Sequence, residues 1–232
     1  HVVHFAPALT TPRTRRTYAL LPIAILGVGG YAWQRARTPD AAEQAAPPKG
    51  CASRAACGAE LGKPAICRAD GRCVALESAQ CKIEADHEAL QAEDTIWIGT
   101  MFPEDHADAY MASFGRSSHL AARLALREIT GSAGVIKRGE RAHRLGIVAC
   151  SDAKEPAEAA RHLAEELQVP AVIGFASSKS VVELSSSLFL ERDVLVVPAL
   201  NSSALIRDIP HPEGSPRMVW RTAVNTESRA EA

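Results

Sequence analysis

Small hydroxyl and amide side chains follow two short apolar runs in the second half of the chain. Ser177 and Ser178 come one residue after the run 171–175, and Asn201 and Ser202 come after the run 194–197. Such groups hydrogen-bond a polar ligand, and the backbone N–H groups of a helix that starts at these serines favour an anion such as a carboxylate. The serines also suit helix capping alone. We predict a ligand contact in addition to the cap, because the second polar loop follows a neighbouring strand.

Other chemistries that these residues suggest lack their required partners. The segment 174–180, GFASSKS, follows an apolar run like a phosphate-binding loop, but Ser178 stands where that loop needs glycine before Lys179. The serine run 185–187 has no GxSxG motif around it, which favours the polar face of a helix over a nucleophile. The acidic loop 105–108 is more typical of a solvated loop than of a metal site. We predict that the protein is not an enzyme and needs no cofactor and no metal ion.

The two apolar runs define the elements that position these loops. The runs 171–175 and 194–197 are long enough for buried strands and too short for helices, and the β-branched content of the second suits an interior parallel strand. The segment 181–191 between them has a helical pattern. Strand, helix and strand at this spacing make a βαβ crossover, and ligands of open parallel sheets bind outside the carboxyl ends of the strands.

The same alternation extends over the whole segment from residue 95 onward. It predicts strands at 95–99 and 145–149, helices at about 116–130 and 156–167, and a final strand at 218–222 after a proline-rich loop. Alternating strands and helices predict an α/β fold, an open parallel sheet with helices on both faces. The apolar residues expected to share a buried face are Leu120, Leu124 and Ile129 in the first helix and Ala160, Leu163, Ala164 and Leu167 in the second.

Five of the six cysteines fall in one block with almost no large apolar side chains. The block contains Cys51, Cys57, Cys67, Cys73 and Cys81, and the sixth cysteine, Cys150, ends the predicted strand at 145–149. Disulfides formed in an oxidising compartment would hold such a segment in shape. Zinc is less favoured, because the block has no CxxC pair and no histidine. Cys150 either pairs with a leftover cysteine of the block or stays buried as a small apolar side chain.

An uncharged segment of 16 residues, 18–33, lies between arginines on both sides. Its tyrosine and tryptophan edges and the arginines before it predict a transmembrane signal anchor or a cleaved signal peptide, with residues 1–17 on the cytoplasmic side. A buried core helix is the alternative. A flexible linker, 34–50, follows, and then the Cys-rich module, 51–94, which is either a contact module or a stapled spacer. We expect the globular part to be periplasmic or extracellular.

The composition is that of an ordinary globular protein. With 232 residues, 47% hydrophobic, the chain is long enough for one good core and a small additional module. A net charge of −1 provides no basic surface, so we expect no nucleic-acid partner. Aromatic residues make up only 5%, which does not suit a stacking surface, and we expect Trp97, Trp220 and Tyr110 to pack in the core or at its rim.

The ordered set of strands and loops resembles a known family. TIWIGTMFPEDHADAYMASFG, then LGIVACSD, VPAVIGFASSKS, VLVVPALNSSALI and MVWRTAVNT, resemble the amino-terminal lobe of type I periplasmic binding proteins, and among these the leucine/isoleucine/valine-binding proteins of ABC transporters. The resemblance covers residues 95–232. Members of that family have two lobes joined by a hinge and bind their ligand between them, so the resemblance implies that this sequence holds the first lobe and that the second lies outside it.

The resemblance also implies roles for particular residues. A hydroxyl residue of the GxxSS-like loop contacts the ligand carboxylate, which corresponds to Ser178 here with Ser177 beside it. A second loop, Pro198 to Asn201, would offer Leu200 and Asn201 to the ligand, and Asn201 replaces the threonine usual in the family, with Ser202 next to it. The loop after the first strand, Glu104 to His106, also departs from the family pattern.

Two functions follow as expectations. The first is an exported, non-catalytic solute-binding domain of the branched-chain amino-acid type. It would bind an amino acid or a similar carboxylate, either for an ABC transporter permease or as the sensor of a membrane-anchored receptor, with residues 18–33 in the membrane. The second is a membrane-anchored interaction or structural protein whose lobe has lost ligand binding. The departures from the family pattern at 104–106 and at Asn201 are consistent with this second function.

Overall fold

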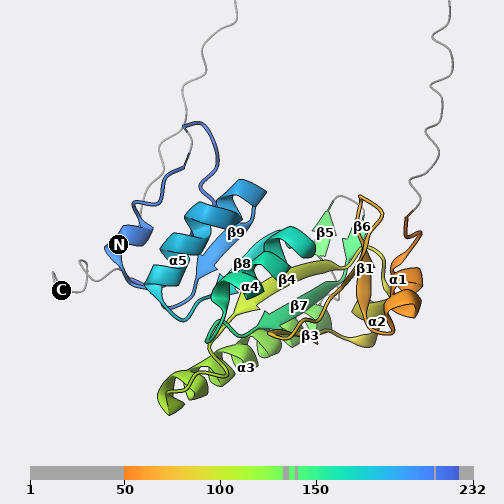
Figure 1. Ribbon diagram of the computed structural model, residues 1–232, viewed down its shortest axis with the longest axis horizontal. Helices are drawn as coiled ribbons and strands as arrows, with labels where there is room; N and C mark the ends of the chain where they lie inside the picture. The colour runs from red at the N-terminus through yellow and green to blue at the C-terminus, as the bar shows by residue number, and fades with distance from the viewer. Residues whose placement is uncertain (1–49, 133–135, 139–140, 212, 225–232) are drawn as a thin grey trace, which may run out of the picture. The chain divides into compact units, whose positions relative to one another are not determined.

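A five-stranded sheet supports most of the described chain (Figure 1). The computed structural model describes residues 50–132, 136–138, 141–211 and 213–224. In spatial order the strands are β3 (Cys81–Glu84), β7 (Leu145–Cys150), β4 (Ile96–Met101), β8 (Ala171–Gly174) and β9 (Leu195–Pro198). The edge strand β3 pairs antiparallel with β7, and the other pairs are parallel. The predicted α/β class with a largely parallel sheet is confirmed.

The order of the strands determines where the helices lie. α3 (Ala109–Ser132) connects β4 to β7, whereas α4 (Pro156–Arg161) and α5 (Ser178–Leu184) connect β7 to β8 and β8 to β9. The first connection crosses the sheet in the opposite direction to the other two. Right-handed crossovers therefore place α3 on one face and α4 and α5 on the other. In Figure 1, α4 and α5 run in front of the strands and α3 lies apart from them.

Two of these helices continue as tighter or wider turns. A π-helical turn, η1 (His162–Glu166), extends α4, and a π-helical turn, η2 (Ser185–Phe189), followed by a 3₁₀ turn, η3 (Leu190–Arg192), extends α5. The predicted helices at 156–167 and 181–191 correspond to these composite helices. The remaining elements outside the Cys-rich block are the hairpin β5 (Ile136–Arg138) and β6 (Arg141–His143) and a 3₁₀ turn, η4 (Ala204–Ile206).

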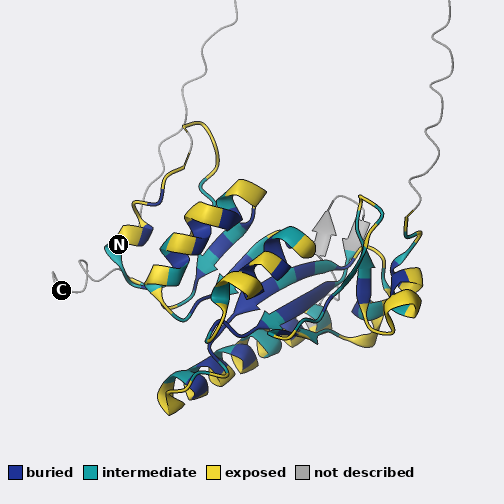
Figure 2. Cartoon of the chain, in the orientation of Figure 1, coloured by how far each residue is buried: buried dark blue, intermediate teal, exposed yellow. Residues whose placement is uncertain are grey.

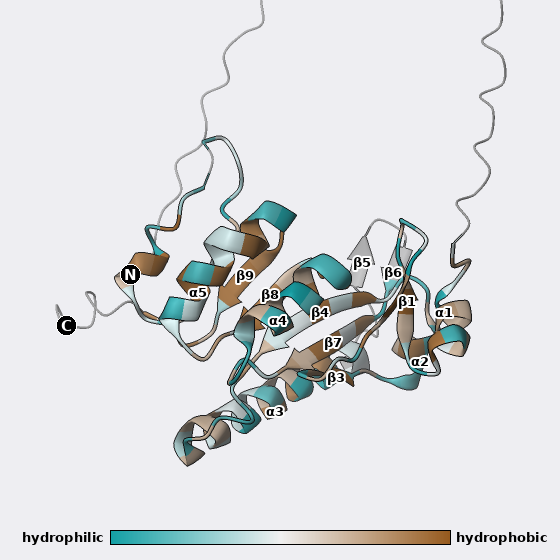
Figure 3. Cartoon of the chain, viewed as in Figure 1, coloured by the Kyte–Doolittle hydropathy of each residue, from teal (hydrophilic) through white to brown (hydrophobic). Residues whose placement is uncertain are grey.

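Two apolar clusters lie on the two sides of the sheet. The larger includes Leu163, Val172 and Phe189, all fully buried, and belongs to the α4 and α5 side. The smaller contains Leu126 of α3 with Leu145 and its neighbours on β7. Figures 2 and 3 show the central strands as largely buried and apolar. The burial pattern along β8 and β9 alternates between half-buried and buried residues, so the face under α4 and α5 is the better covered one.

The prediction of a final strand at 218–222 is wrong, because the segment forms a single bridge instead of a strand. Only Val219 forms a bridge, in parallel to Val196 of β9. The backbone on either side of the bridge is bonded to β9, since the Val196 N–H donates to the Met218 carbonyl and the Trp220 N–H donates to the Val196 carbonyl. On the outer side of the segment, the Arg217 Nε donates to the Val219 carbonyl, and the Trp220 Nε1 donates to the Arg217 carbonyl.

The buried face of α3 also differs from the prediction. Leu120, Leu124 and Ile129 are exposed, and the sheet side of the helix carries Ala112, Gly115, His119 and Leu126 instead. Gly115 explains the rotation, since a Cβ there would lie 2.5 Å from the Pro103 backbone. The helix therefore turns its small residues toward the loop after β4. The predicted buried residues Ala160, Leu163, Ala164 and Leu167 of the next helix are buried, which confirms that face.

The three aromatic residues expected in the core or at its rim differ in burial. Trp97 is buried, as predicted, and Arg54 lies over its ring with the guanidinium carbon 5.4 Å from the ring centroid. Trp220 and Tyr110 are exposed, so the prediction was wrong for both. Trp220 lies on the segment beside β9 that does not become a strand, and Tyr110 lies in the first turn of α3.

Disulfides staple the cysteine block, as predicted. The block forms α1 (Arg54–Leu61), the hairpin of β1 (Ala65–Cys67) and β2 (Cys73–Ala75), β3, and α2 (His87–Gln91). The pairs are Cys51–Cys67, Cys57–Cys73 and Cys81–Cys150. The sulfurs of Cys51, Cys57 and Cys67 lie within 4.8 Å of one another, but all three belong to disulfides and offer no thiolate to a metal ion.

The third disulfide joins the cysteine block to the sheet. Cys81 of β3 and Cys150 of β7 are direct cross-strand neighbours. β3 thus belongs to the large sheet although it lies within the segment 51–94 that we assigned to the Cys-rich module. The antiparallel strand covers the outer edge of β7, where unpaired backbone groups would otherwise be exposed.

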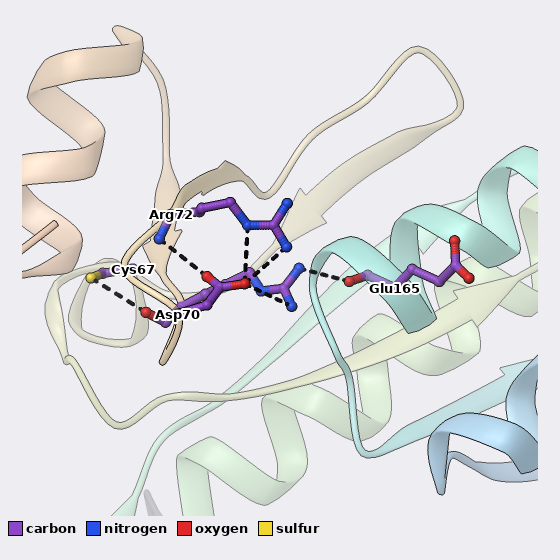
Figure 4. A network of polar contacts seen from close by, with 5 residues as sticks. Cys67, Asp70, Arg72 and Glu165 are labelled. Atoms are coloured by element: carbon purple, nitrogen blue, oxygen red, sulfur yellow. Dashed lines mark hydrogen bonds and ion pairs between the residues drawn. The ribbon is translucent and has the colours of Figure 1, made fainter. Parts of the chain in front are cut away.

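A polar network makes a second connection between the block and the sheet domain (Figure 4). Arg68 donates from Nη1 to the Glu165 carbonyl of η1 at 2.8 Å, and its Nη2 lies 3.2 Å from Asp70. Asp70 also accepts from Arg72, and that hydrogen bond is the main cause of a lowered pKa at the Asp70 carboxyl. The carboxylate therefore holds Arg68 in the orientation that reaches η1.

The predicted membrane segment, 18–33, with residues 1–17 and most of the linker 34–50, lies outside the described residues. Within the part that is described, none of the helices has both the length and the apolar character needed to cross a bilayer.

The disulfides are expected to contribute unequally to stability. Replacing both cysteines of Cys81–Cys150 by alanine should lower the free energy of unfolding by about 4 kcal/mol, and the same change at Cys57–Cys73 by about 3 kcal/mol, because a longer closed loop restricts the unfolded chain more. The sequence separations are 69 and 16 residues. Urea unfolding followed by tryptophan fluorescence measures both losses. A larger loss at Cys57–Cys73 would contradict this ranking.

Candidate functional site

The carboxyl ends of the parallel strands meet at one edge of the sheet, called the carboxyl edge below. β4 lies between β7 and β8, and the register places Met101 beside both Cys150 and Gly174. The chain leaves β4 toward β7 on one side and later returns to β8 on the other. This reversal is a topological switch point, the place where open α/β sheets bind ligands.

The turn after β8 is unusually sharp. Gly174 has φ +127°, and a Cβ there would lie 2.3 Å from the Met101 carbonyl oxygen. The next residue, Phe175, has φ +82°, a rare and costly conformation for a side chain of its size. Its N–H donates to the Met101 carbonyl at 2.5 Å. The backbone of β8 therefore bends closely over the end of β4.

Two buried side chains hold the peptide group that follows this turn, from opposite ends. The Asp152 Oδ2, beyond the end of β7, accepts from the Ala176 N–H at 2.6 Å. The Asn201 Nδ2, beyond the end of β9, donates to the Phe175 carbonyl at 3.4 Å. That carbonyl and that N–H belong to the same peptide bond. We call this arrangement the peptide clamp. It links the loops after three strands.

Each clamp residue has one polar atom left over. Asp152 and Asn201 are buried, with 4% and 5% of their surface exposed. Within the described part of the chain, Oδ1 of Asp152, Oδ1 of Asn201 and Oγ of the neighbouring Ser151 have no hydrogen-bond partner. Buried polar atoms normally have one, and leaving one unpaired costs about 1–3 kcal/mol. Their place at the switch point makes these atoms candidates for contact with a ligand.

The same burial shifts the titration of Asp152. Removal from water raises the pKa of its carboxyl, and the backbone N–H groups of Ala176 and of Asp152 itself oppose this in part. His119 and His106 also lower it through their charge. The ionised form of Asp152 is thus disfavoured by the fold.

A buried histidine lies under the loop after β4. His119 of α3 has its Nε2 3.0 Å from the Thr100 Oγ1 and its Nδ1 2.5 Å from a Glu104 carboxylate oxygen. Its ring meets that of Phe102 edge to face, at 5.1 Å. Glu104 thus turns back toward α3.

The rest of the acidic loop caps a helix. His106 Nδ1 accepts from the Asp108 N–H, and Asp108 Oδ1 accepts from the Met111 N–H in the first turn of α3. Asp105 is exposed. Helix capping accounts for the positions of His106 and Asp108.

A polar cavity opens at the β7 end of the carboxyl edge. Its volume is about 490 Å³, and its lining residues are Ala79, Gln80, Asp105, Ser151, Lys154 and Glu155. Gln80 and Ala79 directly precede the bridging Cys81, so the cysteine block contributes one wall. Ser151, whose hydroxyl lacks a described partner, contributes another.

The sequence-predicted site residues lie at the same edge but differ in burial. Ser177 is the N-cap of α5, and its Oγ accepts from the Ser180 N–H at 3.1 Å. Ser178 and Ser202 are half-buried, Leu200 is exposed, and Asn201 is the most buried of the five. The cap is thus present, and the contacts with a ligand stay a prediction.

Ser151 and Asp152 were not singled out from the sequence. The signal was available, because both follow the predicted strand at 145–149 just as Ser177 and Ser178 follow 171–175. The pairing of Asp152 with the turn after β8 had no sequence signal, since 24 residues separate Asp152 from Ala176.

The chain was compared with known proteins. It matches no protein-family model, and no curated protein is similar to it at a significant level. Among solved structures it is similar to a solute-binding protein of an ABC transporter from Rhodopseudomonas palustris BisB5, solved with 3,4-dihydroxybenzoic acid. The TM-score is 0.44 and the identity 19%, over 57% of this chain and 33% of that one.

A second similar structure is an extracellular ligand-binding receptor from Rhodopseudomonas palustris HaA2. Its TM-score is 0.35 and its identity 16%, over 56% of this chain and 32% of that one. This chain therefore spans about one third of the length of these two proteins. At such scores neither likeness assigns a function.

Gly174 is expected to tolerate no side chain. The substitution Gly174→Ala should lower the free energy of unfolding by roughly 3 kcal/mol, because the positive φ and the close Met101 carbonyl both oppose a Cβ. Gly214→Ala is the matched control. Gly214 also has a positive φ, +79°, but nothing lies within 4 Å of its Cβ position, so a loss of about 1 kcal/mol is expected. Equal losses in chemical denaturation would contradict the close approach.

Asp152→Asn is expected to raise the melting temperature at pH 7 but not at pH 3.5. With a folded-state pKa above the unfolded one, the protonated carboxyl stabilises the fold below the unfolded pKa, and this stability is lost as pH rises through the folded pKa. Asparagine cannot ionise, and its Oδ1 can still accept from the Ala176 N–H. Thermal unfolding at both pH values measures the difference. A variant less stable than the native chain at pH 7 would contradict the assignment.

Proposed function

We propose that the chain is an exported, non-catalytic solute-binding lobe that holds a small carboxylate or amino acid at the carboxyl edge of its sheet. The observation that carries this proposal is the set of buried polar atoms at the switch point without a described partner, on Ser151, Asp152 and Asn201. A ligand that pairs with them would remove the cost of leaving them unpaired. The sequence resemblance to the leucine/isoleucine/valine-binding group supports the same edge.

The serines after β8 suit the recognition of a carboxylate. Ser177 Oγ already accepts from the Ser180 N–H, and it lies 2.9 Å from the Ser180 Oγ. Ser178 is half-buried at the first position of α5, next to the peptide clamp. In this proposal Ser178 donates its hydroxyl proton to the carboxylate, while Ser177 holds the turn. Asn201 and Ser202 border the ligand from the loop after β9, and Leu200 offers an exposed apolar side chain.

The geometry around His119 supports a binding role rather than catalysis. Thr100, His119 and Glu104 make a hydroxyl, imidazole and carboxylate chain, which resembles an activated nucleophile in composition. Thr100 is 1% exposed within β4, however, and His119 is 6% exposed. The Thr100 hydroxyl already pairs with the His119 Nε2 at 3.0 Å, between β4 and α3. These hydrogen-bonded side chains therefore serve to fix α3 against β4.

The larger context is proposed in the same terms. A signal anchor at 18–33 would keep the lobe at the outer face of the membrane, and the three disulfides suit an oxidising compartment. The lobe would serve either an ABC transporter permease or a membrane-anchored sensor. A second lobe would complete the cleft, as in the family that the sequence resembles.

The test is a thermal-shift and calorimetric screen of the full-length protein against amino acids, aliphatic carboxylates and 3,4-dihydroxybenzoate, the compound bound in the BisB5 protein. A ligand at 100 times its Kd should stabilise the fold by about 2.7 kcal/mol. Ser178→Ala is expected to weaken binding about tenfold, whereas Ser187→Ala is the matched control. Ser187 is an exposed helical serine that bonds its own helix at Glu183.

No shift with any compound would contradict the proposal and favour the alternative, an interaction protein whose lobe has lost ligand binding. Equal loss of affinity in Ser178→Ala and Ser187→Ala would remove Ser178 from the site.

A further inference from the structure

Three buried N–H donors lie where the cysteine block meets the amino end of the sheet, opposite the carboxyl edge. They are Nε of Arg54 at the start of α1, Nε of Arg68 after β1, and Nε1 of Trp97 near the start of β4. None of the three has a hydrogen-bond partner within the described part of the chain. Guanidinium and indole N–H groups can only donate, so this end of the sheet lacks the acceptors that buried donors normally have.

Two of these donors belong to residues that line one cavity, called the amino-end cavity below. Its volume is about 300 Å³, and Arg54 and Trp97 both line it. Ile66 and Cys67 of β1 form one wall, and the turn before β8 forms another. Because β1 belongs to the cysteine block, the cavity lies partly outside residues 95–232, the part of the chain that resembles periplasmic binding proteins.

Arg54 and Trp97 are held in place, but not through the two unpaired nitrogens. The Arg54 Nη1 donates to the Ala89 carbonyl at 3.0 Å, and the guanidinium carbon lies 5.4 Å from the centroid of the Trp97 ring. The two residues are 7% and 6% exposed, so bulk water does not satisfy their N–H groups. A ligand acceptor that pairs with these groups would remove the cost of leaving them unpaired.

A carboxylate completes the polar lining of the amino-end cavity. Both oxygens of Glu93 accept from the Arg54 backbone N–H, at 3.0 and 2.9 Å, and a carboxylate can accept several further hydrogen bonds. Glu93 is exposed, as are Gln168 and Pro170 on the same cavity, so the cavity is open to solvent there. The cavity therefore offers one ligand both donors and an acceptor.

A neutral carboxamide matches this combination better than either ion. Burial lowers the pKa of Arg54, and the charges of Glu93 and Asp94 are close enough to oppose this, so they would also repel a ligand carboxylate. A ligand ammonium group would be repelled by Arg54 and would leave both N–H donors unpaired. A carboxamide has a carbonyl oxygen for the donors and an N–H for Glu93, without a net charge.

The rest of the lining limits the size and polarity of the ligand. Sites for small molecules have volumes of about 300 to 1,000 Å³, so the amino-end cavity is at the lower limit. It suits an amide that carries a small aliphatic group. The apolar lining residues are Ile66, Ile96, Leu167, Val169 and Pro170.

We propose that the amino-end cavity is a second binding site, which takes a carboxamide attached to a small aliphatic group. The carbonyl oxygen accepts from the Arg54 Nε and the Trp97 Nε1, and the amide N–H donates to Glu93. Free small amides and peptide chains both carry this group. The inference goes beyond the solute-binding proposal and does not depend on it, because the two sites lie at opposite ends of the sheet.

The two donors give their own proton–nitrogen NMR signals, so a titration can be followed at the site itself. The full chain, labelled with nitrogen-15, is titrated with 3-methylbutanamide and with its isostere 3-methylbutanoate. The Trp97 indole and Arg54 Nε signals are expected to shift and to saturate with the amide, and the acid should bind about fivefold more weakly or not at all. A carboxylate bound at the carboxyl edge would leave both signals in place.

A third probe, N-acetyl-leucinamide, separates the two sources of the amide group. Tighter binding of this peptide-like compound than of 3-methylbutanamide assigns the site to a peptide chain. The reverse order assigns it to a free small amide. Either order supports a carboxamide site.

Two variants test the roles of the lining groups. Glu93→Gln keeps an oxygen for the Arg54 N–H and removes the charge, so the preference for the amide over the acid is expected to fall to about twofold or less. Glu213→Gln, at an exposed glutamate, is its control. Trp97→Phe keeps a ring under Arg54 without the N–H, and amide binding followed at the Arg54 Nε should weaken about fivefold. Trp220→Phe, at an exposed tryptophan, is its control.

Several outcomes would overturn the inference. Signals of Arg54 and Trp97 that no amide moves would remove the site, and equal binding of the amide and the acid would remove the carboxamide class. A purely structural Glu93 would change both affinities alike and leave their ratio as in the native chain. The titration of the native chain decides even if a variant fails to fold, and none of these results bears on binding at the carboxyl edge.

Discussion

The peptide bond between Phe175 and Ala176 is the constraint on which the carboxyl edge depends. Three hydrogen bonds hold the strained Phe175. Its N–H donates to the Met101 carbonyl, the Ala176 N–H donates to Asp152, and the Phe175 carbonyl accepts from Asn201. Gly174 makes the approach to β4 possible. The clamp joins the loops after β7, β8 and β9 through side-chain hydrogen bonds, in addition to the backbone bonds between the strand ends. With it, three loops separated in sequence form one surface.

The cysteine block reinforces the same part of the molecule. The Cys81–Cys150 bridge fixes the end of β7 immediately before Ser151 and Asp152. At the other end of the sheet, Arg54 lies over Trp97 and donates to the Ala89 carbonyl, and Arg68 reaches η1. Burial lowers the pKa of Arg54, and Glu93 and Asp94 oppose that effect. The block is thus joined to the sheet by covalent and polar contacts, and one of them borders the candidate site.

Much of the fold was accessible from the sequence, because apolar runs of four or five residues and helical periodicity are local signals. The strands at 95–99, 145–149, 171–175 and 194–197 correspond to β4, β7, β8 and β9. The face of α3 was not accessible, since the close approach at Gly115 depends on a loop elsewhere in the fold. The disulfide pairing and the role of β3 were likewise open, because Cys81 and Cys150 are 69 residues apart. In the site, Asn201 was predicted from its position after a strand, whereas its clamp partner Asp152 needed the three-dimensional register.

The central claim is that the unpaired acceptors of the peptide clamp belong to a ligand site. A crystal structure of the full-length protein with a bound compound measures this most directly. The account predicts polar atoms of the ligand within hydrogen-bond distance of Oδ1 of Asp152 and Oδ1 of Asn201, with the ligand carboxylate at the serines after β8. A ligand bound away from the carboxyl edge would contradict it.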